Sequence, residues 1–270
     1  MSRIRTKTEQ RGFTLIELLT ALGIFLLVCG AAFTLLGTSQ QRYQTDTQVL
    51  NSFQEARLGL DQIVRDVNDS GYPPPSFNDG VHTNFTDSPF AWSTGYPTTA
   101  NPTGTPCTIG GNCITPGDFD LIIETKINPQ DPGVSWVRYQ LQQGTTTLVR
   151  GTALKTWNQD PDTYTTNIGQ FAPFVQNVVN NAPTAQMIAA YPGMFPGGNP
   201  VPIFSYTCDT PTAPQPQPQA CPAALADNSP RNIRDVVVTL IVAAPLPDAT
   251  TGQPRLVQLS GRGRRINPNQ

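Results

Sequence analysis

The stretch GFTLIEL at residues 12–18 decides the fold of this 270-residue chain. A short basic leader precedes it, and an almost wholly apolar run follows it as far as Leu36. Residues 18–36 are long enough to span a membrane, for which about 20 apolar residues suffice. The basic residues of the leader all precede this run, so that end is expected to lie in the cytoplasm and the bulk of the chain outside.

Glu17 is an acid near the start of the apolar run and needs a partner there. An acid at the centre of a membrane helix costs roughly 2.5–3.5 kcal/mol on insertion scales. Either Glu17 snorkels to the lipid surface, or it pairs with a positive group, because opposite charges attract strongly in a weakly screened apolar core. Intramembrane acids are functional by default, so we expect Glu17 to have a partner with a functional role.

The charged leader ending in Gly12, the Phe13 that follows and the acid four residues further on resemble the class III signal of the type IV pilin superfamily. The resemblance implies that prepilin peptidase cuts after Gly12 and methylates the new amino terminus, Phe13. It also implies a partner for Glu17, the free α-amino group of a neighbouring subunit in a filament.

A secretory signal peptide or a plain signal anchor is the rival interpretation of this segment. Gly30-Ala31-Ala32 offers the small residues that signal peptidase requires. A secretory signal is cleaved after its apolar core, however, and here the core continues to Leu36.

The helix is expected to continue beyond the membrane, because no proline occurs between Phe13 and Gly71. Apolar residues recur there at helical spacing on one face; they are Val49, Leu50, Phe53, Ala56, Leu60, Ile63, Val64 and Val67. On the opposite side four residues alternate in charge at i, i+4 spacing, which is typical of a solvated helix face; they are Arg57, Asp61, Arg65 and Asp69.

The sequence pattern of residues 72–270 predicts one β-rich domain with long insertions. Runs rich in β-branched and aromatic residues are expected to be strands; they are residues 119–127, 134–142, 145–150, 201–207, 235–243 and 255–259. The second and third of these predict a hairpin around Gln143-Gly144. Tracts of Pro, Gly, Thr and Asn at residues 73–117, 158–200 and 208–233 predict extended surface loops.

The formal charge of the chain is −2, and processing would make it more negative. Loss of residues 1–12 lowers the basic count from 17 to 13 and the acidic count from 19 to 18, which gives −5. No nucleic-acid partner is predicted, because such binding favours a basic footprint. The one basic cluster, at Arg262, Arg264 and Arg265, is expected to end a final strand in solvent.

The five cysteines divide by location. Cys29 lies in the apolar run and is expected to be a buried small hydrophobe. The others lie in the exported part, where an oxidising compartment favours disulfides; they are Cys107, Cys113, Cys208 and Cys221. Pairing of sequence neighbours would close two short loops, although four cysteines allow three connectivities.

No catalytic, cofactor or metal site is predicted, and the chain is not expected to be an enzyme. Zinc is the alternative for the cysteines, but paired C-x-x-C elements are missing and the sole histidine, His82, is remote. Asn158, Asp160 and Asp162 have the oxygen spacing that opens a calcium loop, without the glycine and glutamate that such a loop needs further on.

The end of the helix makes the resemblance more specific. Residues 56–72, ARLGLDQIVRDVNDSGY, look like the helix end of PilW-type minor pilins and J-type pseudopilins. The resemblance implies an α+β, pilin-like fold, with a long N-terminal helix packed on an antiparallel β-sheet with long loops. Its parts would be a leader (1–12), a membrane or filament-core helix (13–37), an amphipathic continuation (38–71) and an exported domain (72–270).

The same resemblance implies a low-abundance structural subunit of a type IV pilus, near its tip. Its partners would be prepilin peptidase and other major and minor pilin subunits. The chain would cross the inner membrane once with its C-terminal domain in the periplasm, and then enter a pilus at the cell surface. A type II secretion pseudopilin and a signal-anchored adhesive or binding protein remain as alternatives.

Overall fold

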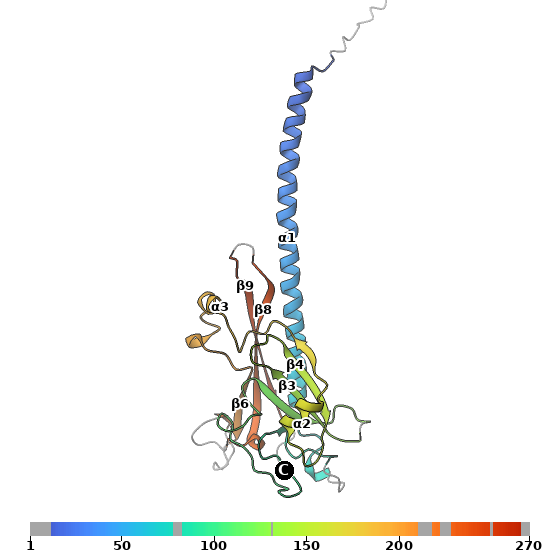
Figure 1. Ribbon diagram of the computed structural model, residues 1–270, viewed down its shortest axis with the longest axis vertical. Coiled ribbons are helices and arrows are strands. Elements are labelled where there is room, and N and C mark those ends of the chain that lie inside the picture. The colour runs from blue at the N-terminus through green and yellow to red at the C-terminus, as the bar shows by residue number, and fades with distance from the viewer. Residues whose placement is uncertain are drawn as a thin grey trace, which may run out of the picture. The chain divides into compact units, whose positions relative to one another are not determined.

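The computed structural model describes residues 12–77, 83–130, 132–209, 218–221, 228–248 and 251–265. The chain divides into two compact units, Met1–Thr47 and Gln48–Gln270. One helix, α1 (Leu15–Asn68), begins in the first unit and ends in the second (Figure 1). The predicted unbroken helix is thereby confirmed.

In the first unit, the apolar part of α1 exposes its large side chains, from Phe13 to Leu36. Its mean hydropathy reaches 2.4, and by length and composition it can cross a membrane. The hydroxyl groups of its threonines are satisfied within the helix: Thr20 donates to the carbonyl of Ile16 at 3.0 Å, and Thr34 to that of Ala31 at 2.8 Å. These polar groups therefore need no water as a partner.

The described part of the second unit contains two antiparallel sheets. The five-stranded sheet has the order β1 (Phe90–Ala91), β2 (Asp120–Thr125), β3 (Ser135–Leu141), β4 (Leu148–Leu154) and β5 (Ala172–Val175). The four-stranded sheet has the order β7 (Pro218–Cys221), β6 (Phe204–Asp209), β8 (Ile233–Pro247) and β9 (Pro254–Arg264). The antiparallel α+β prediction is confirmed, with two sheets in place of one.

Each predicted strand overlaps an observed one, and the predicted hairpin is β3 and β4, in which Leu141 pairs with Leu148. The prediction of long surface loops is wrong in part. In their described residues, those tracts hold two short helices and three strands that the sequence did not indicate: α2 (Pro161–Ile168), α3 (Ala185–Ala190), β1, β5 and β7. They also hold three 3-10 turns, η1 (Pro75–Phe77), η2 (Pro196–Gly198) and η3 (Pro230–Asn232).

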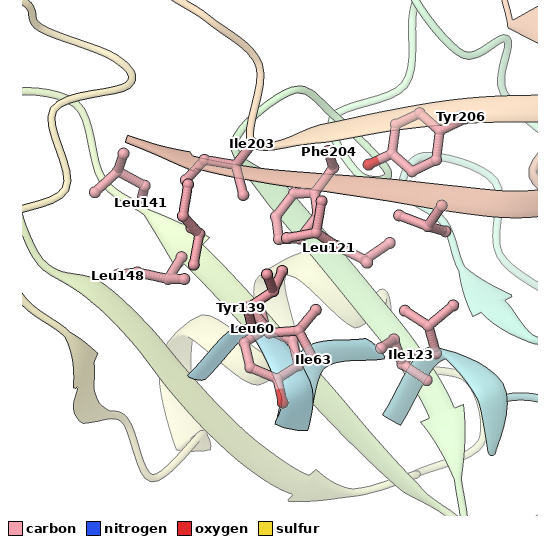
Figure 2. Close-up of a cluster of buried hydrophobic side chains, with 14 of the residues drawn as sticks. Leu60, Ile63, Leu121, Ile123, Tyr139, Leu141, Leu148, Ile203, Phe204 and Tyr206 are labelled. Carbon is pink, nitrogen blue, oxygen red and sulfur yellow. The ribbon is translucent and has the colours of Figure 1, made fainter. Parts of the chain in front are cut away.

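The core of the second unit lies where the end of α1 meets both sheets. This buried cluster joins Ala56, Leu60, Ile63 and Val67 of the α1 stripe to Leu121 and Tyr139 of the first sheet and Phe204 of the second (Figure 2). The predicted burial is wrong for Leu50 of the same stripe, which is 60% exposed. Burial of one such large side chain contributes about 1.5–3 kcal/mol. The four charged residues of the opposite face, predicted to be solvated, are exposed.

Glycines let the helix approach the sheets closely. A Cβ built on Gly263 of β9 would lie 2.6 Å from Cγ1 of Val67, and one built on Gly59 of α1 would lie 2.4 Å from Cγ2 of Val175 in β5. Real Cβ atoms do not come so close, so backbone occupies space that a side chain would need. The amphipathic half of α1 is therefore fitted to β5 and β9.

Candidate functional site

The expected cleavage site, Gly12–Phe13, lies just before α1 begins at Leu15. Phe13 is 89% exposed, and a Cβ built on Gly12 would touch nothing within 4 Å. The bond is therefore accessible and outside regular structure, as a peptidase substrate must be. The rest of the leader, residues 1–11, lies outside the described residues.

Glu17 and Thr14 form a reciprocal cap at the start of α1. The backbone N–H and the hydroxyl of Thr14 donate to Oε2 of Glu17 at 2.9 and 2.8 Å, and Glu17 N–H donates to the Thr14 hydroxyl at 3.4 Å. This is a capping box, in which an N-cap Thr and a Glu three residues later satisfy each other's backbone donors. Glu17 thus has a role in starting the helix as well as the expected role in assembly.

The capping role is a feature that the sequence reasoning missed, although the T-x-x-E spacing signals it. Both hydrogen bonds that the Glu17 side chain accepts use Oε2, and among the described residues Oε1 has no hydrogen bond. One carboxylate oxygen thus holds the cap, and the other takes no part in it. The carboxylate can serve the helix start and still accept a bond from another chain.

The four cysteines beyond α1 form two disulfides between sequence neighbours. Cys107 joins Cys113 and Cys208 joins Cys221, with Cα atoms 5.0 and 5.6 Å apart. Cys29 is free and half-buried. The second disulfide links the adjacent strands β6 and β7 and belongs to the main core.

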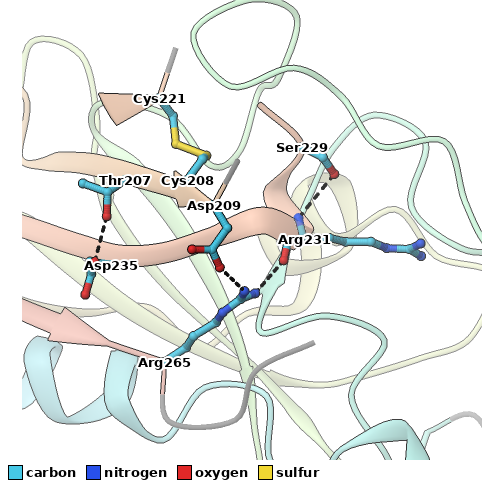
Figure 3. The surroundings of a disulfide bond; sticks show 8 residues. All are labelled: Thr207, Cys208, Asp209, Cys221, Ser229, Arg231, Asp235 and Arg265. Atoms are coloured by element: carbon cyan, nitrogen blue, oxygen red, sulfur yellow. Dashed lines mark hydrogen bonds and ion pairs between the residues drawn. A yellow bond between two sulfur atoms is a disulfide. The ribbon is translucent and has the colours of Figure 1, made fainter. Parts of the chain in front are cut away.

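Charged side chains lie near the second disulfide, as Figure 3 shows, and Arg265 and Asp235 among them are buried. Arg265 donates to the carboxylate of Asp209 at 3.2 Å and to the carbonyl of Arg231 at 2.6 Å. The prediction that the C-terminal arginines all lie in solvent is therefore wrong for Arg265, which is 9% exposed. Burial, only partly offset by Asp209, lowers the pKa of its guanidinium.

Asp235 on β8 forms a second pair with the same arginine cluster. Its Oδ2 accepts from Arg262 at 2.6 Å and from Thr207 at 2.9 Å. Burial alone would raise the pKa of this carboxyl, but the bonds from Arg262 and Thr207 outweigh it and lower the pKa. Arg262 therefore forms an ion pair with Asp235 of β8, although its side chain is more than half exposed.

The oxygens considered for a calcium loop have other partners. Asp160 caps α2 by accepting from Thr163 N–H at 3.1 Å, and Asp162 pairs with the buried Arg138 at 2.5 Å. Asn158 accepts from Thr99 N–H at 2.5 Å. Across the described ranges, no group of three His, Cys, Asp or Glu side chains could hold a metal ion. His82 lies outside the described residues.

A groove of about 710 Å³ lies between the two disulfides. Its lining combines aromatic and polar side chains, among them Phe119, Tyr206, Asp118 and Gln142. Tyr206 donates its hydroxyl to the carbonyl of Gly117 at 2.6 Å. Burial raises the pKa of the Asp118 carboxyl, which is consistent with its place at the groove wall.

Comparison with known families gives one match, to the N-terminal part of this chain. A family model described as the prokaryotic N-terminal methylation motif matches residues 7–35, which include the Gly12–Phe13 junction and Glu17. With the long apolar helix and the antiparallel sheets that follow, this match supports the type IV pilin superfamily. No curated protein and no solved structure matches the chain.

Proposed function

We propose that this chain is a minor pilin of the PilW type, a non-catalytic subunit that is incorporated into a type IV pilus. The observation that carries the proposal is the methylation motif at residues 7–35, set on a helix whose apolar side chains are exposed. Exposed apolar surface of this extent requires lipid or other helices around it. The sequence likeness of residues 56–72 to PilW-type minor pilins, which J-type pseudopilins share, supports a subunit of this group.

The N-terminal geometry supports a role in assembly. In lipid, Glu17 has the cap from Thr14 on one oxygen, and its other oxygen requires a donor. Cleavage after Gly12 would create one in each subunit, an α-amino group with positive charge. Pairing between subunits would neutralise both charges inside the filament.

The direct experiment is to shear filaments from cells and to identify their subunits by mass spectrometry. The proposal expects this chain in the filament fraction in small amount beside a major pilin. Glu17→Val should give a cleaved, membrane-inserted chain that is missing from the filaments. Thr20→Val is the matched control, because it removes a polar group from the same helix that is bonded only within that helix.

Two alternatives predict other results. A type II secretion pseudopilin would be found with pseudopilus subunits and would be needed for protein export. A signal-anchored binding protein would use the groove between the disulfides and would remain in the membrane fraction whatever residue stands at position 17. Equal incorporation of the wild-type and Glu17→Val chains would contradict an assembly role for Glu17.

A further inference from the structure

A buried lysine faces two carboxylates inside the first sheet, far along the chain from the N-terminal motif. Lys155, directly after β4, has a wholly buried side chain. Its Nζ lies 2.5 Å from Oδ2 of Asp87 and 3.2 Å from Oε2 of Glu124. The Glu124 side chain is also wholly buried, and that of Asp87 is 10% exposed.

Every member of this triad, Lys155, Asp87 and Glu124, is fixed by further bonds. Glu124 accepts from the backbone N–H of Asp87 at 2.9 Å, from Trp136 Nε1 at 3.3 Å and from the hydroxyl of Tyr96. Lys155 also donates to the carbonyl of Phe85 at 3.0 Å. The amine and the carboxylates thus cannot move apart without breaking a network that spans β2, β3 and the segment before β1.

Aromatic rings enclose the amine. The Nζ of Lys155 lies 5.8 Å from the ring centroid of Phe85 and 5.7 Å from that of Tyr96, and Tyr96 packs on Trp136 with ring centroids 5.6 Å apart. Such an apolar shell excludes water and penalises separated charges. It therefore holds the amine against the two carboxylates without competing water.

We propose that Lys155 and Asp87 become joined by an intramolecular isopeptide bond, formed by the folded chain itself, with Glu124 as the catalytic acid–base. No such modification follows from a role in a filament, so the proposal is independent of the proposed function. Asp87 is the acceptor because its carboxylate lies nearest to Nζ. Glu124 touches the same nitrogen and lies beside the Asp87 backbone.

The reaction is a condensation, and its atoms balance without a co-reactant. The lone pair of Nζ attacks Cγ of Asp87, so that the Nζ–Cγ bond forms and one Cγ–O bond breaks. The original ammonium gives up two protons, one directly to the carboxylate and one through Glu124, and the departing oxygen leaves with both as water. Glu124 ends in its starting protonation state, and nothing is oxidised or reduced.

Physical reasons favour this reaction in the buried triad. The fold holds the amine and the carboxylate in contact, so the reaction needs no bimolecular encounter and its barrier is lower. The water that is released can escape to solvent. Burial raises the pKa of Glu124, against the opposing effect of Lys155, and so makes its carboxylate a better proton acceptor. The bond would close a loop between residues 68 positions apart, which restricts the unfolded chain as other cross-links do.

The test uses the full-length processed protein, purified from membranes in detergent and digested with trypsin after reduction of the disulfides. The expected result is one branched peptide that joins Lys155 to Asp87, lighter than its two parts by one water, with no cleavage after Lys155. Separate peptides at full mass, with cleavage after Lys155, would overturn the proposal. A link from Lys155 to Glu124 would overturn the assignment of the acceptor.

Variants test the role of each group. Lys155→Arg keeps the charge and Asp87→Ala removes the acceptor, so both should lack the branched peptide. Glu124→Gln keeps the shape but cannot carry a proton, and it should leave most of the chain unlinked; full linkage would overturn the catalytic role. Lys126→Arg is the matched control and should be linked like the wild type. If a variant fails to fold, the wild-type peptide map alone still decides whether the bond exists.

Discussion

Tyr139 on β3 donates a 2.6 Å hydrogen bond to Oδ2 of Asp66, which lies in the last turn of α1. Arg150 on β4 pairs with the same oxygen at 3.0 Å, and Gln62 donates to the other oxygen at 2.7 Å. Desolvation, together with the negative charge of Asp66, raises the pKa of the Tyr139 hydroxyl. The end of α1 is therefore held to the first sheet by polar bonds as well as by apolar packing.

Removing the hydroxyl at this contact should weaken the second unit. Tyr139→Phe leaves Asp66 without one donor and Arg150 without one acceptor, so the free energy of unfolding should fall by about 1–3 kcal/mol. Urea unfolding of the full-length protein in detergent measures this. Asp61→Asn, on the exposed face of the same helix, is the control and should change stability by less than about 0.5 kcal/mol. Equal effects of the two variants would contradict the role of this contact.

The close approach of α1 to β9 predicts that Gly263 cannot carry a side chain. Gly263→Ala would place a methyl group 2.6 Å from Val67, and overpacking of this kind costs typically about 1–3 kcal/mol. Thermal unfolding should show a lower midpoint. Gly193→Ala is the matched control, because a Cβ there meets nothing within 4 Å. A Gly263→Ala protein as stable as the wild type would show that the helix and strand can separate without cost.

The disulfide between β6 and β7 should contribute measurably to stability. It closes a sequence separation of 13 residues, for which chain entropy gives about 3 kcal/mol. The double variant Cys208→Ala, Cys221→Ala should lose stability of that order, whereas Cys29→Ala should leave the second unit unchanged. Peptide mapping without reduction should recover Cys107–Cys113 and Cys208–Cys221. Cross-pairing between the two loops would contradict the structure.

The lowered pKa of Asp235 predicts that the free energy of unfolding falls in acid. Its pKa is lowered in the folded chain, so its contribution is present above the unfolded value of 3.8 and is lost as the pH falls through the folded pKa. Urea midpoints measured from roughly pH 5 down to pH 3 should therefore fall, and the fall should be smaller in Asp235→Asn. Arg262→Gln should reduce the same slope because it removes a bond that lowers the pKa. If the urea midpoint falls with pH as steeply in both variants as in the wild type, this explanation is wrong.

The elements that the sequence predicted correctly are those with long, regular patterns. The apolar run and the helical spacing up to Val67 indicated α1, and runs rich in β-branched and aromatic residues indicated β2, β3, β8 and β9. The short strands β1 and β5 were missed because two to four residues, with Pro173 in one of them, carry no periodic signal. They form because the longer strands β2 and β4 each have an edge to which a short strand can pair.

The polar contacts of the fold were beyond prediction for a different reason. Asp66 and Tyr139 are 73 positions apart, and Lys155 and Asp87 are 68 apart, so their meeting depends on the register of several strands. Two local signals were present and went unused. The T-x-x-E spacing of Thr14 and Glu17 marks a capping box, and the alternate glycines Gly261 and Gly263 mark a strand face against which a helix packs.

The mass and sequence of the amino-terminal peptide of the mature protein test the assignment to the pilin superfamily most directly. The chain should begin at Phe13 and carry one methyl group on its α-nitrogen, and Gly12→Asp should leave the full-length precursor in the membrane. The exposed position of Gly12–Phe13, ahead of the helix start at Leu15, is the structural reason to expect cleavage there. A mature chain that begins after Ala32, or an uncleaved wild-type chain, would contradict it.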